Sequence, residues 1–130
     1  MRCYIDSSAI IKLIKFERES KHLVTALPER ILSSNLARIE VLRAITVFSS
    51  DLLESAYAVL AEIEMLAIDN AVLAWAENFP PFITLRTLDS IHLASALTIK
   101  NEIGGIITYD KEMMKAATTL GFKVLSPGMK

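Results

Sequence analysis

Short apolar runs alternate along the chain with longer segments in which apolar residues recur at the spacing of a helix. The runs predict five strands, at residues 2–5, 31–33, 65–68, 106–109 and 122–125. The longer segments predict helices at about residues 9–16, 18–27, 36–48, 51–62, 70–78, 88–100 and 111–120. Short apolar strands separated by helices are typical of a parallel sheet covered on both faces. The pattern therefore predicts a protein of the α/β class.

Length and composition favour one ordinary domain that spans residues 1–130. The chain has 130 residues, of which 52% are hydrophobic, so it can bury a core of its own. No apolar stretch is long enough for a membrane span, and the first residues lack the pattern of a secretory signal, so we expect a cytoplasmic protein. The single cysteine, Cys3, excludes an internal disulfide and suits a reducing compartment.

Charge is distributed unevenly along the chain. Residues 1–43 carry eight Lys and Arg against five Asp and Glu, whereas residues 44–85 carry six acidic residues and no Lys or Arg. The acidic middle segment would repel a phosphate backbone, so any nucleic acid is expected to bind another face.

Two aspartates follow predicted strands directly. Asp6 comes after the first strand and Asp110 after the fourth. Ligands of open α/β sheets bind outside the carboxyl ends of the strands, where the strand order reverses. The two carboxylates would meet there if the first and fourth strands are neighbours. Each aspartate also stands where a helix begins, so two independent helix caps are an alternative.

Glu40 lies on the apolar side of the helix predicted at residues 36–48. Its carboxylate is therefore expected to point toward the core or a cleft. The alternative is an ion pair with Arg43, three residues further along the helix. One flexible arginine compensates a buried carboxylate poorly, which favours the first interpretation.

Asp89 stands in the first turn of a predicted helix, where the helix dipole favours a negative charge. His92 follows on the same helix face. We expect His92 to be a core histidine bonded to a carboxylate or carbonyl rather than a metal ligand, and it could orient Asp89. Carboxylates gathered at one sheet edge would repel one another unless cations neutralised them, and oxygen ligands favour Mg²⁺ or Mn²⁺. Such a centre suits phosphodiester hydrolysis.

The chain resembles the PIN-domain nucleases, and among them the VapC toxins of toxin–antitoxin pairs. The likeness lies in YIDSSA at residues 4–9, Glu40 within a helix, LDSIHLASA at residues 88–96 and TYD at residues 108–110. The likeness covers nearly the whole chain and includes four acidic residues in the order Asp, Glu, Asp, Asp. The resemblance implies a three-layer α/β/α fold around a five-stranded parallel sheet of order 3-2-1-4-5.

The resemblance also implies the roles of the site residues. It makes the chain a Mg²⁺- or Mn²⁺-dependent endoribonuclease, with Asp6 and Asp89 as the expected direct metal ligands. Ser8 and Thr108 are expected to donate hydrogen bonds to these carboxylates. Capping of the first helix would then pass from Asp6 to Ser7 or Ser8. The catalytic and metal-binding set is Asp6, Glu40, Asp89 and Asp110, with Ser8, Thr108 and His92 in support.

Relatives of this kind act on RNA, inhibit translation, form homodimers and are silenced by a small antitoxin protein. The helix predicted at residues 9–16 is apolar nearly all round, so either a partner or the protein's own core could cover it. Many relatives have a further Asp or an aromatic residue soon after the TYD element, where this chain has KEMM at residues 111–114. Glu112 could assist a second metal, although its helix position favours exposure, so one-metal and two-metal chemistry both stay open. Basic residues that could contact RNA are Arg18, Lys21, Arg38, Arg43 and Arg86.

Two other functions fit parts of the pattern. One is a receiver-like domain whose acidic cluster binds Mg²⁺ and accepts a phosphoryl group, although Asp6 lacks the acidic neighbour that such domains need. The other is a PIN-like scaffold that has lost catalysis and only binds a partner.

Overall fold

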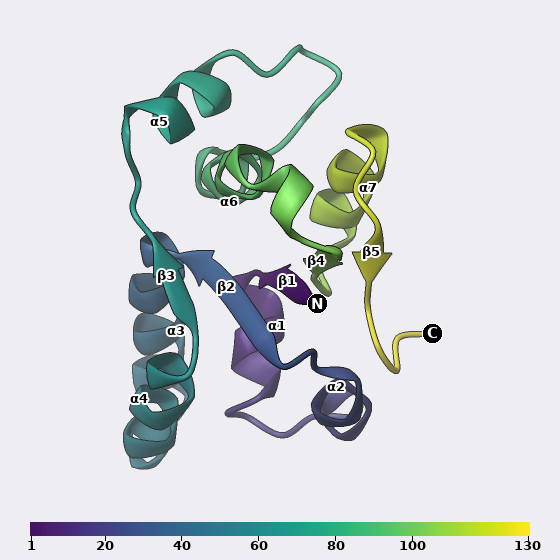
Figure 1. Cartoon of the computed structure of the whole chain (residues 1–130). Helices are drawn as coiled ribbons and strands as arrows, with labels where there is room; N and C mark the ends of the chain where they lie inside the picture. The colour runs from purple at the N-terminus through teal and green to yellow at the C-terminus, as the bar shows by residue number, and fades with distance from the viewer.

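A computed structural model describes residues Met1–Lys130 and shows a five-stranded parallel sheet of order β3-β2-β1-β4-β5 (Figure 1). The predicted fold class and strand order are therefore confirmed. The first strand lies at the centre of the sheet, between β2 and β4. The strand bounds are β1 (Arg2–Ile5), β2 (Arg30–Ser34), β3 (Glu64–Leu66), β4 (Gly105–Ile107) and β5 (Val124–Leu125).

Helices connect these strands close to the positions predicted. The predicted helix at residues 51–62 begins as a short 3-10 turn, and the one at residues 88–100 is followed by another. The helices are α1 (Ser7–Lys12), α2 (Ser20–Ala26), α3 (Asn35–Phe48), η1 (Ser50–Leu52), α4 (Leu53–Ala61), α5 (Asn70–Glu77), α6 (Thr87–Thr98), η2 (Lys100–Glu102) and α7 (Lys111–Thr119). None of them is both long and apolar enough to cross a bilayer.

The two faces of the sheet bury separate clusters of apolar side chains. Cys3 and Ile5 of β1 pack in a cluster with residues of α1, α2, α3 and α4. Tyr4, between them in the strand, packs in a second cluster with residues of α6 and α7. Successive side chains of a strand point to opposite faces, so the alternation in β1 separates the layers. Helices thus cover both faces of the sheet.

The first helix is shorter than predicted and begins earlier. It starts at Ser7 because the Asp6 carboxylate accepts a hydrogen bond from the Ala9 amide, and it ends at Lys12. The Leu13 and Ile14 amides bond to carbonyls three residues back, which tightens and closes the last turn.

The apolar excess of this segment mostly serves the protein's own core. Ile10 and Ile14 are buried, and Ile11 and Leu13 pack against the same cluster. Phe16, the remaining large apolar residue of the segment, is 72% exposed.

Strand register brings the first two site residues together. Ile5 of β1 is paired with Ile107 of β4, so Asp6 and Thr108 follow side by side. The Asp6 amide extends the ladder by donating to the Ile107 carbonyl, with an N···O distance of 3.2 Å. The carboxyl ends of β1 and β4 therefore meet at one point of the sheet edge, as the sequence predicted.

Candidate active site

Asp6 is a buried carboxylate with a hydrogen-bond donor for each oxygen. Oδ1 accepts from the Ser8 hydroxyl at 2.6 Å and from the Ala9 amide at 3.2 Å. Oδ2 accepts from the Thr108 hydroxyl at 2.5 Å. Ser8 and Thr108 thus make the contacts that the resemblance implied. The expectation that Ser7 or Ser8 takes over the helix cap is wrong, because Asp6 caps α1 itself while accepting the other two bonds.

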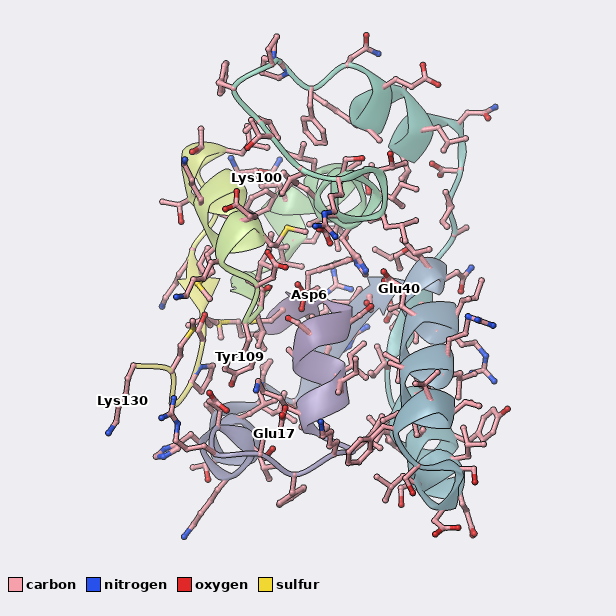
Figure 2. All side chains as sticks on the ribbon, turned by 180° about the vertical axis from the view of Figure 1, so that it is seen from behind. Asp6, Glu17, Glu40, Lys100, Tyr109 and Lys130 are labelled. Carbon is pink, nitrogen blue, oxygen red and sulfur yellow. The ribbon has the colours of Figure 1, made fainter.

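Only 4% of Asp6 is exposed, and this burial raises the pKa of its carboxyl group. Hydrogen bonds from Ser8 and Thr108 act in the opposite direction, because they stabilise the ionised form. Figure 2 shows Asp6 at the end of α1 nearest the sheet edge, with Glu40 on the neighbouring α3. Asp6 is therefore held firmly in place at the inner part of the site.

Glu40 contacts a serine and a histidine rather than an arginine. Its Oε1 accepts from the Ser7 hydroxyl at 2.6 Å and lies 2.6 Å from His92 Nε2. Burial by itself would raise the pKa of Glu40, but the hydrogen bonds from His92 and Ser7 outweigh it and hold the pKa below its ordinary value. The alternative of an ion pair with Arg43 is wrong, because α3 directs Glu40 inward toward α1 and α6.

His92 is a buried core histidine bonded to a carboxylate, but the carboxylate is Glu40. The expectation that it orients Asp89 is wrong, because its two ring nitrogens are taken by Glu40 and by the Tyr4 hydroxyl, 2.7 Å from Nδ1. The four residues Tyr4, His92, Glu40 and Ser7 form a hydrogen-bonded group that we call the His92 network.

Asp89 differs from these acids because no protein donor bonds to its carboxylate. It is half-buried in the first turn of α6. Burial raises its pKa, and the negative charge of Asp110 raises it further, followed by those of Asp6 and Glu40. His92 opposes this shift only in part. The other three predicted acids thus act electrostatically on Asp89.

A pocket of about 290 Å³ opens in front of Asp89 and has no hydrophobic residue in its lining. Asp110 also lines it, and at the same time caps α7 by accepting from the Met113 amide at 2.9 Å. The helix-cap interpretation of Asp110 is therefore correct, and the same residue also lines the pocket. Asp6 and Glu40 lie behind the pocket rather than in its lining. The lining residues are Thr84, Arg86, Asp89, Asp110 and Glu112.

The oxygens near this pocket suit a hard divalent cation, although no three acidic, histidine or cysteine side chains are close enough here to hold one jointly. The donors are carboxylates and hydroxyls, the ligands that Mg²⁺ and Mn²⁺ prefer. The uncompensated charge at Asp89 is what a cation would neutralise. The donor set therefore fits such an ion, with Asp89 and Asp110 nearest the pocket.

Three residues take part in the site in ways that the sequence did not predict. Tyr4 was treated only as a strand residue and Ser7 only as a cap, whereas both belong to the His92 network. A tyrosine on a buried strand needs a partner for its hydroxyl, and that need was the available signal. Glu112 is exposed, as its helix position suggested, yet it lines the pocket.

Comparison with known proteins agrees with this architecture. The PIN domain family model matches residues 3–118. Ribonuclease VapC46 of Mycobacterium tuberculosis is 42% identical over 128 residues, which cover 95% of this chain and 96% of that protein.

Solved structures share the fold at low sequence identity. A toxin–antitoxin complex from Klebsiella pneumoniae aligns with a TM-score of 0.76 at 18% identity and covers 96% of this chain and 97% of the matched chain. The sarcin-ricin loop cleaving toxin VapC20 of Mycobacterium tuberculosis aligns with a TM-score of 0.75 at 15% identity, over 96% and 99% of the two chains. With its site at the meeting point of β1 and β4, this chain belongs to the PIN-domain family and, within it, to the VapC proteins.

Proposed function

We propose that this chain is a divalent-metal-dependent endoribonuclease that acts as the toxin of a toxin–antitoxin pair and stops translation by cutting RNA. The observation that carries the proposal is the pocket lined by Asp89, Asp110 and Glu112, with no hydrophobic residue in its lining, near the point where the carboxyl ends of β1 and β4 meet. Names of full-length relatives, including Ribonuclease VapC46, support RNA as the substrate class.

In this proposal Asp89 and Asp110 hold Mg²⁺ or Mn²⁺ at the pocket, with Asp6 and Glu40 completing the acidic centre. The ion's contribution when bound is to polarise the phosphoryl oxygen and stabilise charge on the leaving oxygen. The protein keeps Asp6 and Glu40 in fixed orientations through Ser8, Thr108, Ser7 and His92. Preorganised groups of this kind need not be reordered during the reaction.

Arg86 is the basic residue of the pocket lining, and no acidic side chain forms an ion pair with it. A guanidinium without a protein partner next to a carboxylate pocket is suited to bind an RNA phosphate. Of the five basic candidates from the sequence, Arg86 therefore has the strongest support. We assign it the binding of substrate rather than of metal.

An antitoxin partner and a homodimer belong to the same proposal. The described relatives include toxin–antitoxin complexes, and the chain exposes large apolar side chains that a partner could cover. Eight of them lie in two regions that Figure 1 places apart, α3–α4 and α5 with the loop after it. The residues are Ile39, Val47, Phe48 and Tyr57 in the first region, and Leu73, Trp75, Phe82 and Leu88 in the second region and at the start of α6.

The test of the enzymatic proposal is cleavage of bacterial RNA by the purified chain in Mg²⁺, in Mn²⁺ and in EDTA. Asp89→Asn should lower the metal-dependent cleavage rate by about 100-fold or more, the scale of losing one electrostatic group at a reacting centre. Glu29→Gln is the matched control, since Glu29 is exposed and lies outside the pocket.

Full cleavage in EDTA, or by the Asp89→Asn variant, would contradict the proposal. If the wild-type protein neither cleaves RNA nor binds Mn²⁺, the inactive-scaffold alternative is the better description. Membership of the PIN-domain family removes the support for the receiver-like alternative.

A further inference from the structure

Glu40 uses one carboxylate oxygen for the protein and leaves the other free. Ser7 Oγ and His92 Nε2 both lie 2.6 Å from Oε1, whereas Oε2 has no hydrogen-bond partner in the protein. Rotation of the carboxylate would break both bonds to Oε1. The two contacts therefore keep Oε2 available to a group from outside the protein.

When Glu40 is ionised and the His92 ring is neutral, the hydrogen atoms of the His92 network have one consistent arrangement. Nε2 must then carry a hydrogen in order to donate to Oε1, which leaves the Nδ1 of a neutral ring as an acceptor. The Tyr4 hydroxyl, 2.7 Å from Nδ1, supplies the hydrogen for that bond.

The network is closed to solvent at its inner end. His92 is 2% exposed and Tyr4 is 1% exposed, and their rings meet edge to face with centroids 5.9 Å apart. Four elements contribute one residue each, namely β1, α1, α3 and α6. The buried His92 ring is therefore not accessible to a substrate, whereas 24% of the Glu40 side chain is exposed.

We propose that His92, held by Tyr4 as the Nε2–H tautomer, is a positioning residue that fixes Glu40 with Oε2 available to a divalent cation. This inference rests on the proposed nuclease function. It goes further by assigning cation affinity in part to two residues that never touch the cation. Groups that orient metal ligands from behind typically change metal affinity or activity by about 10- to 100-fold.

The direct test compares His92→Gln with His92→Asn. The amide nitrogen of Gln can occupy the position of Nε2 and still donate to Glu40, whereas that of the shorter Asn corresponds to Nδ1 and cannot reach it. Mn²⁺ affinity, measured by calorimetry in the absence of RNA, should fall about 10- to 100-fold in His92→Asn. In His92→Gln it should stay close to the wild-type value.

Controls separate positioning from folding. Thermal unfolding of both variants shows whether they remain folded, and replacement of the exposed His22 by Asn should leave Mn²⁺ affinity unchanged. Equal Mn²⁺ affinities in folded His92→Gln and His92→Asn variants would overturn the inference. Failure of the proposed function is a different result, in which the wild-type protein binds Mn²⁺ but does not cut RNA.

A second measurement needs no substitution of His92. Nitrogen-15 NMR of the metal-free wild-type protein should show an unprotonated Nδ1 and a protonated Nε2 for this ring. Tyr4→Phe should remove the donor to Nδ1 and weaken that preference. A wild-type ring with its hydrogen on Nδ1 would overturn the proposed arrangement even if the His92 variants do not fold.

Discussion

Asp6 and Asp89 both stand at the beginning of a helix, yet the structure treats them in opposite ways. Asp6, in the inner part of the site, is 4% exposed and accepts hydrogen bonds from Ser8, Ala9 and Thr108. Asp89, in the pocket, is partly exposed and accepts none. The inner part is thus satisfied by the protein itself, whereas the pocket carries charge that the protein leaves uncompensated.

This difference indicates that the inner carboxylates maintain the geometry of the site, whereas the pocket carboxylate binds a ligand. Inner carboxylates that are fully bonded keep the site in one geometry before any ligand arrives. A pocket carboxylate that is opposed by its neighbours destabilises the free protein and gains most from a cation. Functional sites often retain such unfavourable groups at a cost in stability. Three substitutions can break or sharpen this comparison.

The largest effect on stability is expected from Asp6→Ala. It leaves the Ala9 amide and the hydroxyls of Ser8 and Thr108 without their acceptor in a buried place, at a cost of about 2 kcal/mol in the free energy of unfolding. Asp6→Asn should cost less, because its oxygen still accepts from Ser8 and Ala9. Urea denaturation of both variants measures this difference. Equal losses would mean that the hydrogen bonds of Asp6 do not stabilise the fold.

A smaller effect is expected from Arg86→Ala, which removes positive charge from the pocket lining. The KM for RNA should rise about tenfold, equivalent to about 1.4 kcal/mol, while Mn²⁺ binds no more weakly. Steady-state cleavage and calorimetry separate the two outcomes. The control is Arg30→Ala, because Arg30 is exposed at the beginning of β2, away from the carboxyl ends of the strands, and does not line the pocket. Unchanged KM in Arg86→Ala would remove Arg86 from the substrate site.

The smallest effect is a gain in stability from Asp89→Asn in the metal-free protein. The raised pKa of Asp89 means that its ionised form is less favourable in the folded than in the unfolded chain. Solvent screens this partly exposed group, so the gain at neutral pH should be only about 0.5 kcal/mol.

The pH dependence follows from the direction of that shift. Below the unfolded-state pKa of about 3.9 the aspartate is protonated in both states and the two proteins should be equally stable. As the pH rises through the raised folded-state pKa, the wild-type protein should lose stability relative to Asp89→Asn and then remain lower. Unfolding in EDTA from pH 3 to 7 tests this, with Glu29→Gln expected to show no such difference. A wild-type advantage at pH 7 would contradict the electrostatic account of the pocket.

The alternation of strands and helices could be predicted from the sequence because the spacing of apolar residues within each segment indicates its type. The position of Asp6 directly after β1 followed from the same pattern, whereas Asp110 lies three residues beyond the end of β4 at Ile107. Motif resemblance supplied the strand order. Element ends were less certain. The first helix was placed from Ala9 to about Phe16, whereas Asp6 starts it at Ser7 and tight backbone bonds close it after Lys12.

The partners of the site residues were decided by the tertiary structure. His92 and Glu40 are 52 positions apart, and no local pattern states which carboxylate a core histidine will meet. That contact exists because α3 and α6 approach the same end of β1, where Tyr4 and Ser7 complete the network. Local periodicity records which face of an element is buried, but the choice of hydrogen-bond partner depends on how whole elements pack. The sequence thus determined the elements and the acids, and packing determined which acids are satisfied and which one is left for a ligand.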